Sequence, residues 1–333
     1  MTKKDRLKNI AWITKLAKAK NWQVKKKGLE KAVFKPNPRF AYFPLVNADG
    51  KKEFFKSCLY GNEDLTSRLR RELLVIKWFL SRNGPVRKIT DSGQADGLLW
   101  YTAPYLSGQN WRNCVEEDVS PLSQKDAALL AKKIIWLGEI KKTQIPPKLQ
   151  KALRLPFGTK EEYAKTGQEI NRHLKVLKTA SKVPATGWTP QLSQTIKDFW
   201  NQNKPQIAGA KTSGVLVHND LAPNNIFFSD QKIIILDWEG AYWSSNRILN
   251  GALDLAFFYC RCWQKEILGK YLLKKISLSK IGKRIDFRLS LKIGFVLAIL
   301  RKMAPMFEAG FYKNKLDQAN FAFMIKTLKS LEL

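Results

Sequence analysis

The sequence predicts an α+β fold of two lobes, with a small lobe on a mostly antiparallel sheet and a larger, mostly helical lobe. Three observations predict this class. The chain has 333 residues, which is too long for one ordinary core but suits two lobes. Strand-like runs around one long helical pattern fill the chain up to about residue 106. Helical periodicity dominates after that point.

The chain is predicted to divide into three segments. Residues 1–20 form a basic amphipathic helix, residues 21–106 form a lobe with a five-stranded sheet and one helix, and residues 107–333 form the helical lobe. The first segment has apolar residues at helical spacing, with lysines opposite them. It could touch an anionic surface, although packing against the rest of the fold is the favoured interpretation.

The strands of the small lobe are predicted from short runs of β-branched and aromatic residues. These runs are Trp22–Val24, Ala32–Phe34, Phe40–Val46, Glu53–Lys56, Val86–Ile89 and Leu98–Thr102. A hairpin turn at 47–50 joins the third and fourth runs, and a second turn spans Gly93 to Gly97. Apolar residues at helical spacing predict a helix over 64–82, which the Asn-Gly-Pro at 83–85 ends.

Helical periodicity organises the large lobe. Helices are predicted over 123–137, 160–180, 190–202 and in several pieces within 250–333. The first of them opens on a capping box of Ser123 and Asp126, with Asp in place of the usual Glu or Gln. A strand–loop–strand unit interrupts the helices at Val215–Val217, Asn225–Phe228 and Ile233–Leu236.

The charge balance is strongly basic. Lysine and arginine number 59 against 28 aspartate and glutamate residues, a formal net charge of +31. One explanation is a polyanionic partner such as nucleic acid or an acidic membrane surface. The other is a general lysine bias with solvated side chains. It is favoured because the lysines spread along the whole chain instead of clustering.

The remaining composition argues against several classes of protein. Four cysteines lack the spacing of a zinc site or a disulfide framework, and two histidines argue against a histidine-based metal site. The first 20 residues lack the apolar core of a signal peptide. The apolar run from Ile293 to Leu300 is far shorter than the roughly 20 residues of a membrane span. Reduced thiols and a cytoplasmic location are expected.

Polar residues gather where the strands of the strand–loop–strand unit end, a place where a buried core gives no reason for them. Phosphoryl transfer needs a carboxylate near the acceptor hydroxyl and oxygen ligands for Mg²⁺. Asp220 fits the first role. Asn225 and Asp237 fit the second, and a short hairpin would bring them side by side. The pattern predicts a phosphotransferase site, and the alternative is a surface loop with polar residues by chance.

The same segment resembles the aminoglycoside phosphotransferase/choline kinase family, whose members have a protein-kinase-like fold. Family members carry a loop such as His-Gly-Asp-Leu-His-Pro-Gly-Asn and a following strand that ends Ile-Asp-Trp-Glu. This chain has His-Asn-Asp-Leu-Ala-Pro-Asn-Asn at 218–225 and Leu-Asp-Trp-Glu at 236–239. It also has the family's later Asp-Leu-Ala, at 254–256.

The resemblance implies an ATP- and Mg²⁺-dependent phosphotransferase. It implies that Asp220 is the catalytic base or orients the acceptor, and that Asn225 and Asp237 bind Mg²⁺. His218 and Asp254 would be structural supports of the loop.

The resemblance also extends to the small lobe. Family members place a lysine on the third strand and a glutamate on the next helix, and Lys56 and Glu72 are the best matches. Lys56 would hold the α- and β-phosphates while Glu72 orients it. Lys51 and Lys52 are alternatives for the lysine, and Glu63 is the rival glutamate, although it precedes the helix.

The segment 102–108 resembles the hinge that meets adenine, which implies nucleotide contacts at Ala103 and Tyr105. The chain departs from the family in one respect. The region between the first strands holds a single glycine, Gly28, so a glycine-rich phosphate loop is not visible. Asn37 stands where the family often has an Asn after its glycines.

A small hydroxyl compound is a better acceptor than a protein. Asn219 replaces the Arg that protein kinases carry beside the catalytic Asp, and no Ala-Pro-Glu follows. An amino alcohol, a sugar, an aminoglycoside-like molecule or an anionic metabolite remains open as the acceptor. Four aromatic residues could form a cage for a quaternary ammonium such as choline, although core packing is favoured; they are Tyr242, Trp243, Tyr259 and Trp263. The competing function is a degenerate kinase fold that binds a polyanion such as RNA or a membrane surface.

Overall fold

The chain folds as two compact units in a computed structural model. The structure describes residues 1–36, 38–106, 109–110, 123–154, 158–209, 214–229 and 232–333. Unit 1 consists of Met1–Gln109 and Phe227–Ala241, and unit 2 consists of Asn110–Ile226 and Tyr242–Leu333. Unit 1 is built on a small antiparallel sheet and unit 2 is mostly helical, so the predicted α+β class is confirmed.

Unit 1 combines short strands with three helices. Its helices are α1 (Lys3–Ala19), α2 (Lys26–Phe34) and α3 (Thr66–Leu80). Its strands are β1 (Ala41–Val46), β2 (Lys52–Ser57), β3 (Asp91–Ala95), β4 (Leu98–Pro104), β5 (Gln109–Asn110), β7 (Ile226–Ser229) and β8 (Lys232–Ile235). The first four strands form an antiparallel sheet in the order β1-β2-β4-β3, and β5, β7 and β8 form a second sheet.

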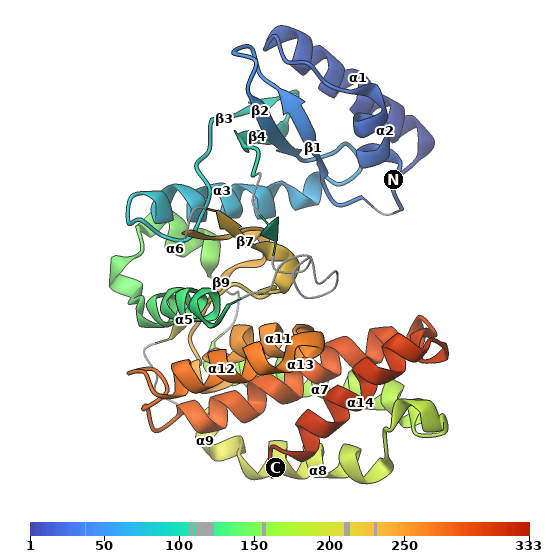
Figure 1. The fold of residues 1–333 in the computed structure, drawn as a ribbon, viewed down its shortest axis with the longest axis vertical. Coiled ribbons are helices and arrows are strands. Elements are labelled where there is room, and N and C mark those ends of the chain that lie inside the picture. The colour runs from blue at the N-terminus through green and yellow to red at the C-terminus, as the bar shows by residue number, and fades with distance from the viewer. Residues whose placement is uncertain (37, 107–108, 111–122, 155–157, 210–213, 230–231) are drawn as a thin grey trace. The chain divides into compact units, whose positions relative to one another are not determined.

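The core of unit 1 joins its helices to the four-stranded sheet. Figure 1 shows α1 and α2 alongside this sheet. Trp12 and Ile13 of α1 pack in one cluster with Val33 of α2, Phe55 of β2 and Leu69 of α3. The predicted first helix therefore packs against the fold, and the apolar face seen in its sequence is buried.

Two predicted strands of unit 1 were wrong. Ala32–Phe34 lies in α2, because Leu29, Ala32 and Val33 recur at helical spacing and bury one face of that helix. A short apolar run cannot be assigned to helix or strand by its pattern alone. Trp22–Val24 contributes only an isolated bridge, from Gln23 to Val46. The sheet that β1 enters accordingly has four strands instead of the expected five.

A third predicted strand was displaced. Val86–Ile89 has no regular secondary structure, and the strand beside β4 is β3. Ala95 pairs with Leu98, so Asp96 and Gly97 form a two-residue hairpin turn with φ values of 50° and 81°. Asp-Gly is the residue pair that such a turn prefers, and this pair fixes where the strand ends.

Unit 2 is a bundle of helices with one short pair of strands. Its helices are α5 (Gln124–Glu139), α6 (Pro147–Leu153), α7 (Thr159–Ala180), α8 (Pro190–Gln202), α9 (Lys204–Ala208), α10 (Arg247–Asn250), α11 (Leu253–Arg261), α12 (Glu266–Ser277), α13 (Phe287–Glu308) and α14 (Lys315–Lys329). The strands are β6 (Val215–Val217) and β9 (Tyr242–Ser244). The predicted helices over 123–137, 160–180 and 190–202 are confirmed as α5, α7 and α8, and the capping box of Ser123 and Asp126 is present.

Helix α13 is the centre of the core of unit 2. It packs against α7, α10, α11 and α14, and Figure 1 shows it as a long orange-red helix among them. Its sequence is apolar on more than one face, so it buries residues along most of its length. Among the described helices, none combines the length and the apolar character that a membrane crossing requires.

The strand pair of unit 2 leads directly into the candidate catalytic loop. β6 and β9 are antiparallel, with Leu216 opposite Trp243. Gly214 precedes β6 with a φ of 69°, and a Cβ atom there would lie 2.5 Å from Trp243 Nε1 and 2.7 Å from the carbonyl oxygen of Ser244. Glycine is required at the entrance to β6 because no side chain fits.

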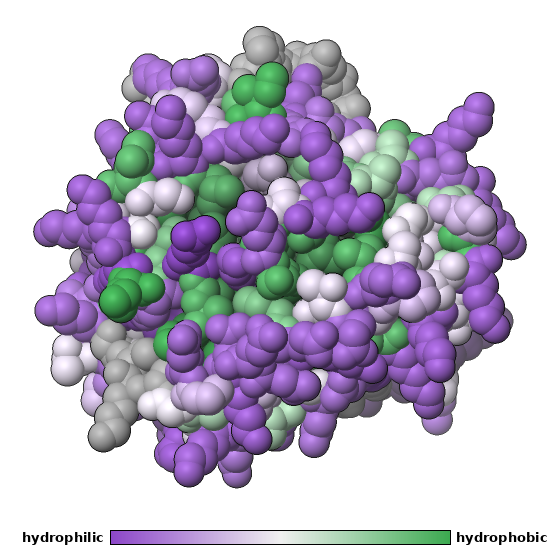
Figure 2. Space-filling view, turned by 90° about the horizontal axis from the view of Figure 1, so that it is seen from below, coloured by the Kyte–Doolittle hydropathy of each residue, from purple (hydrophilic) through white to green (hydrophobic). Residues whose placement is uncertain are grey.

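The hydrophilic residues do not gather into one patch on the face shown in Figure 2. Hydrophilic side chains spread across that face, with patches of apolar residues in the recesses between them. This distribution agrees with the even spread of lysines along the sequence.

Candidate active site

The first group of predicted site residues meets at Lys56 in unit 1. Lys56 lies in β2 and is 5% exposed. Its Nζ donates to Glu72 Oε2 at 2.7 Å, to Asp237 Oδ1 at 2.7 Å and to Glu239 Oε2 at 3.1 Å. The fold thus brings a lysine of the sheet, a glutamate of α3 and two acids that follow β8 into one buried cluster.

The rival residues for this cluster lie elsewhere. Lys51 and Lys52 are exposed, whereas Lys56 is buried. Glu63 lies in a 3-10 turn before α3, while Glu72 lies within α3 and is 1% exposed. Of the lysines and glutamates that the sequence offered, the structure pairs Lys56 with Glu72.

The charge of Lys56 is fixed by its partners. Burial alone would lower its pKa, since a low-dielectric interior disfavours the ammonium. The carboxylates of Glu72 and Asp237, with a smaller contribution from Glu239, outweigh burial and raise the pKa of Lys56 well above its ordinary value. The side chain therefore remains a cation at physiological pH.

Glu72 is held on its other side by a buried tyrosine. Tyr101 of β4 donates its hydroxyl to Glu72 Oε1 at 3.1 Å and accepts a bond from Arg87 Nη2 at 3.2 Å. Burial, and then the charge of Glu72, raise the pKa of Tyr101 to about 12. The hydroxyl stays protonated, so it remains a donor that orients the carboxylate toward Lys56.

The two acids after β8 are positioned by the tryptophan between them. Trp238 is 1% exposed, donates from Nε1 to the carbonyl of Ile235 at 2.9 Å and packs edge-on against Phe79. Asp237 has a φ of 63°, a left-handed conformation uncommon for residues other than glycine. Burial of the indole anchors the turn, and the side chains of Asp237 and Glu239 both reach Lys56.

Glu239 is a site residue to which sequence reasoning gave no role. It is 5% exposed, and Arg39 Nη2 donates to its Oε1. Arg71 Nη1 donates to its backbone carbonyl at 3.2 Å. Burial, opposed by Lys56, raises the pKa of Glu239. The sequence does mark Glu239, because it is the last residue of the Leu-Asp-Trp-Glu segment. No sequence pattern, however, shows that its side chain turns into the interior.

Three carboxylates of unit 1 are close enough to share a cation. Ligand oxygens of Glu72, Asp237 and Glu239 lie within 4.8 Å of one another. Carboxylate oxygens are the ligands that Mg²⁺ prefers. Glu72 and Glu239 are turned toward Lys56 in the interior, whereas the side chain of Asp237 is 38% exposed. Within unit 1, Asp237 is the acid of this group that an incoming metal ion can reach.

The second group of predicted residues forms the loop after β6 in unit 2. The backbone N–H groups of His218 and Asn219 donate to Asp254 Oδ2 at 2.6 Å and Oδ1 at 2.8 Å. The His218 side chain accepts in turn from the N–H of Asp220, at 3.2 Å from Nδ1. Burial raises the pKa of Asp254, and the hydrogen bonds from the N–H groups of His218 and Asn219 oppose this rise. One acid on α11 thus fixes the start of the loop.

Asp220 and Asn225 are brought together by the same loop. Asn225 Nδ2 donates to the Asp220 carbonyl at 2.9 Å and to Asp220 Oδ2 at 3.2 Å. Asn225 is buried, while the side chain of Asp220 is 44% exposed. The amide nitrogen of Asn225 is therefore occupied by the loop and its Oδ1 faces a single described donor, Asn224 Nδ2, at 3.1 Å. An amide oxygen of this kind can still accept a metal ion.

Arg261 is a second residue that sequence reasoning missed. It ends α11, and its Nη2 lies 3.5 Å from Asp220 Oδ1. Both side chains are partly exposed, so solvent weakens their attraction.

The residue between His218 and Asp220 has an unusual backbone conformation, since Asn219 has a φ of 70°. Asn tolerates this conformation better than most residues, which is consistent with its place in the tight loop.

The predicted adenine contacts lie at the end of β4. Ala103 is fully buried and pairs with Phe54 of β2. Tyr105 is 41% exposed, its N–H donates to the carbonyl of Lys52 at 3.2 Å, and the Lys52 ammonium lies 3.8 Å from its ring centroid. Of the predicted hinge, Ser107 and Gly108 lie outside the described residues, as does Asn37 of the predicted phosphate region.

The aromatic residues proposed as a choline cage mostly serve the core. Tyr259 is 7% exposed and stacks on Phe323. Tyr242 and Trp243 are neighbours in β9, so their side chains point to opposite faces of the strand. Core packing, the favoured alternative, is what the structure shows for Tyr259.

Asn225 belongs to unit 2 and Asp237 to unit 1. Their expected meeting across a hairpin therefore stays a prediction.

Comparisons with known proteins agree with this site geometry. Residues 45–245 match a family described as APH, phosphotransferase enzyme family. No curated protein matches the chain. The match covers β2, α3 and the segment from His218 to Asp237, so it includes most of the predicted site residues.

Several solved structures share the fold. Aminoglycoside phosphotransferase APH(4)-Ia is 11% identical, with a TM-score of 0.54 over 94% of this chain and 97% of that chain. A thermostable mutant of APH(4)-Ia, in ternary complex with AMP-PNP and hygromycin B, is 12% identical, with a TM-score of 0.55 over 89% and 92%. A putative fructosamine-3-kinase from Haemophilus somnus is 14% identical, with a TM-score of 0.52 over 88% and 87%. At this identity the likeness concerns the fold, and it confirms the predicted kinase-like architecture.

Proposed function

The chain belongs to the phosphotransferase enzyme family, and on that premise we propose that it transfers the γ-phosphate of ATP, with Mg²⁺, to a hydroxyl group of a small molecule. The acceptor would be an amino alcohol, a sugar or an aminoglycoside-like compound. The proposal gains support from the APH(4)-Ia mutant of the same fold, whose complex holds AMP-PNP and hygromycin B, a nucleotide analogue and a small molecule.

The observation that carries the proposal is the cluster around Lys56. A buried ammonium bonded to Glu72 and Asp237 is a fixed positive charge next to an accessible carboxylate. Phosphoryl transfer is largely a matter of placing such charges against phosphate oxygens. In the proposed mechanism Lys56 binds the α- and β-phosphates, Glu72 orients Lys56, and Ala103 and Tyr105 contact the adenine.

Asp237 and Asn225 would hold the metal ion. Both present oxygen atoms, a carboxylate in one case and an amide in the other, which suits a hard cation. When bound, Mg²⁺ neutralises the charge on the β- and γ-phosphate oxygens. Asp237 can turn toward an incoming ion because its side chain is partly exposed, and the loop holds Asn225 in place through its bonds to Asp220.

Asp220 would act on the acceptor. Its carboxylate is open to solvent on one side and receives a hydrogen bond from Asn225 on the other. The acceptor hydroxyl oxygen forms a bond to the γ-phosphorus while the bond from that phosphorus to the β–γ bridging oxygen breaks. ADP leaves with the bridging oxygen, and the hydroxyl proton passes to Asp220. His218 and Asp254 contribute by holding the loop.

The test is an Asp220→Asn variant assayed for ATP-dependent phosphorylation of a panel of amino alcohols, sugars and aminoglycosides. Loss of a general base typically costs about 10²–10⁴-fold in rate. We expect that loss in turnover, with nucleotide binding retained. Asp198→Asn is the matched control, because Asp198 is an exposed acid of α8. Wild-type turnover in Asp220→Asn would contradict the role of Asp220. An inactive wild-type chain that binds RNA in a salt-sensitive way would support the binding-module alternative instead.

A further inference from the structure

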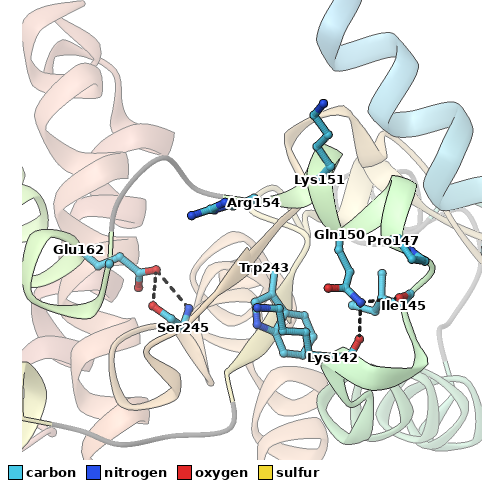
Figure 3. A pocket seen from close by; sticks show the side chains of 10 residues that line it. Lys142, Ile145, Pro147, Gln150, Lys151, Arg154, Glu162, Trp243 and Ser245 are labelled. Carbon is cyan, nitrogen blue, oxygen red and sulfur yellow. Dashed lines mark hydrogen bonds between the residues drawn. The ribbon is translucent and has the colours of Figure 1, made fainter.

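A cavity in unit 2 is lined by none of the residues assigned to phosphoryl transfer. It has a volume of about 560 Å³ and is bounded by α6, the N-terminal end of α7 and β9. Pockets of 300–1,000 Å³ are typical of small-molecule sites. Figure 3 shows the side chains that line it, and none of them comes from the loop that carries Asp220.

The lining is positively charged. Lys142, Lys151 and Arg154 are all exposed residues at this cavity. Within the part of the chain that the structure describes, no carboxylate forms an ion pair with any of the three. Figure 3 shows Arg154 extending across the cavity toward the side of Glu162 and Ser245, whereas Lys151 points away from them. Arg154 is therefore the cation best placed to meet a ligand.

The one carboxylate among the lining residues does not cancel this charge toward a ligand. Glu162 is 3% exposed and accepts from Ser244 Oγ at 2.8 Å, from the Ser245 N–H at 3.2 Å and from Ser245 Oγ at 3.2 Å. Its carboxylate oxygens are therefore occupied by hydrogen bonds from Ser244, the last residue of β9, and from Ser245 after it. Arg154 therefore meets the cavity without a competing free acid among the lining residues.

The remaining wall is apolar and fixed. Trp243 and Ile145 are both largely buried, and Pro147 completes this side. Gln150 Nε2 donates to the carbonyl of Ile145 at 2.7 Å, which ties α6 to the segment before it. Trp243 and Arg154 form a backbone bridge, so the bases of the indole and guanidinium side chains are held next to each other.

We propose that this cavity binds an anionic small molecule that carries a flat apolar ring, with its anionic group at Arg154 and its ring against Trp243. Guanidinium groups bind phosphate and carboxylate through paired hydrogen bonds, and an aromatic face adds contact area for a ring. None of the residues that line the cavity is assigned to the nucleotide or the acceptor, so the cavity would bind its ligand whether or not the chain transfers phosphate.

Calorimetric titration of the full chain with phenyl phosphate tests the proposal. A saturating non-hydrolysable ATP analogue is present, so that binding at the proposed nucleotide position does not contribute. We expect one molecule bound per chain, and an affinity for phenol and for inorganic phosphate at least about tenfold weaker, because each lacks one of the two recognised parts.

Two variants locate the binding. Arg154→Met should weaken phenyl phosphate by about tenfold or more, whereas Lys151→Met, which removes an equal charge that points away, should weaken it by less than about threefold. Both residues are exposed, so the fold should be retained, and unchanged thermal unfolding checks this. Equal affinity in wild type and Arg154→Met, equal binding of phenol, or absence of binding at millimolar phenyl phosphate would each overturn the proposal.

Discussion

The Lys56 cluster of unit 1 and the Asp220 loop of unit 2 hold their functional groups by different physical means. Around Lys56, side-chain charges hold one another: one ammonium bonds to three carboxylates in a mostly buried cluster. In the Asp220 loop, side chains hold the backbone, because Asp254 accepts from two N–H groups and Asn225 donates to the Asp220 carbonyl. The first arrangement depends on charge balance and the second on local hydrogen bonds.

This difference predicts which mutations should lower the stability of the fold and which should lower only the turnover. A buried charge that loses its partner is costly, whereas a pair of charges removed together is often tolerated. A partly exposed carboxylate such as Asp220 can be changed at little cost in folding. We therefore expect the two groups to separate in experiments that measure unfolding and turnover side by side.

The largest effect is expected for Lys56→Met. The substitution leaves Glu72 and Glu239 buried without their cation, and breaking a buried pair typically costs about 3–5 kcal/mol of unfolding free energy. Denaturant unfolding measures this loss, and the phosphorylation assay should show turnover falling with it. Lys52→Met on the same strand is the control, because Lys52 is exposed. A stable Lys56→Met protein would show that the cluster does not depend on charge balance.

An ion pair between two helices of unit 2 sharpens the comparison. Arg301 of α13 donates to Glu169 of α7 through Nε at 2.7 Å and Nη2 at 2.8 Å. Burial alone would raise the pKa of Glu169. The nearby His173, whose Nε2 lies 3.5 Å from Glu169 Oε1, and the hydrogen bonds from Arg301 outweigh burial and hold the pKa at about 2, against an ordinary 4.5. Because the folded pKa is depressed, the stabilisation is present above pH 4.5 and is lost as the pH falls through about 2.

Glu169→Gln should therefore lose up to about 3 kcal/mol of unfolding free energy at pH 7. The difference from wild type should shrink as the pH falls from 4.5 toward 2. Urea unfolding at a series of pH values measures both. Turnover should remain close to that of wild type, because the described partners of Glu169 are Arg301 and His173, and neither has a role in the proposed chemistry. A pH-independent difference would mean that the carboxylate charge is not what stabilises this pair.

The smallest effect on stability is expected for Asp254→Asn. One carboxylate oxygen becomes an NH₂ group that cannot accept, so the N–H of His218 or Asn219 loses its partner, at a cost of about 1–3 kcal/mol. Turnover should fall more than stability predicts, because the loop that carries Asp220 is no longer fixed. Asp317→Asn on α14 serves as the comparison variant. A stability loss as large as that of Lys56→Met would mean that the Lys56 cluster and the Asp220 loop do not differ in how their groups contribute to stability.

Much of the fold could be predicted because its signals are local. The capping box at Ser123 and the long periodic patterns of α7 and α8 specify helices without help from distant residues. The strand ending in Lys56 was predictable from its β-prone residues. By contrast, Ala32–Phe34 is a short apolar run, and only packing of Leu29 and Val33 into the core of unit 1 makes it helical.

The candidate site was also predictable from the sequence only in part. The motif after β6 and the acid after β8 gave Asp220, Asn225 and Asp237, because each lies next to the end or the start of an apolar strand in sequence. Glu239 and Arg261 could not be assigned a place. The inward orientation of Glu239 depends on the burial of Trp238, and the approach of the partly exposed Arg261 to Asp220 depends on where α11 ends. Such contacts are properties of tertiary packing, and a single sequence does not display them.

The glycine that precedes β6 has a consequence for how freely this protein can change. Every replacement at Gly214 would push a Cβ atom into Trp243 and the Ser244 carbonyl, and would also have to adopt a positive φ. Gly28, in α2, has open space around it and a backbone that any residue accepts. In a library of random variants, position 214 should be nearly invariant among survivors while position 28 drifts. Sequence divergence would then leave the entrance to β6 unchanged.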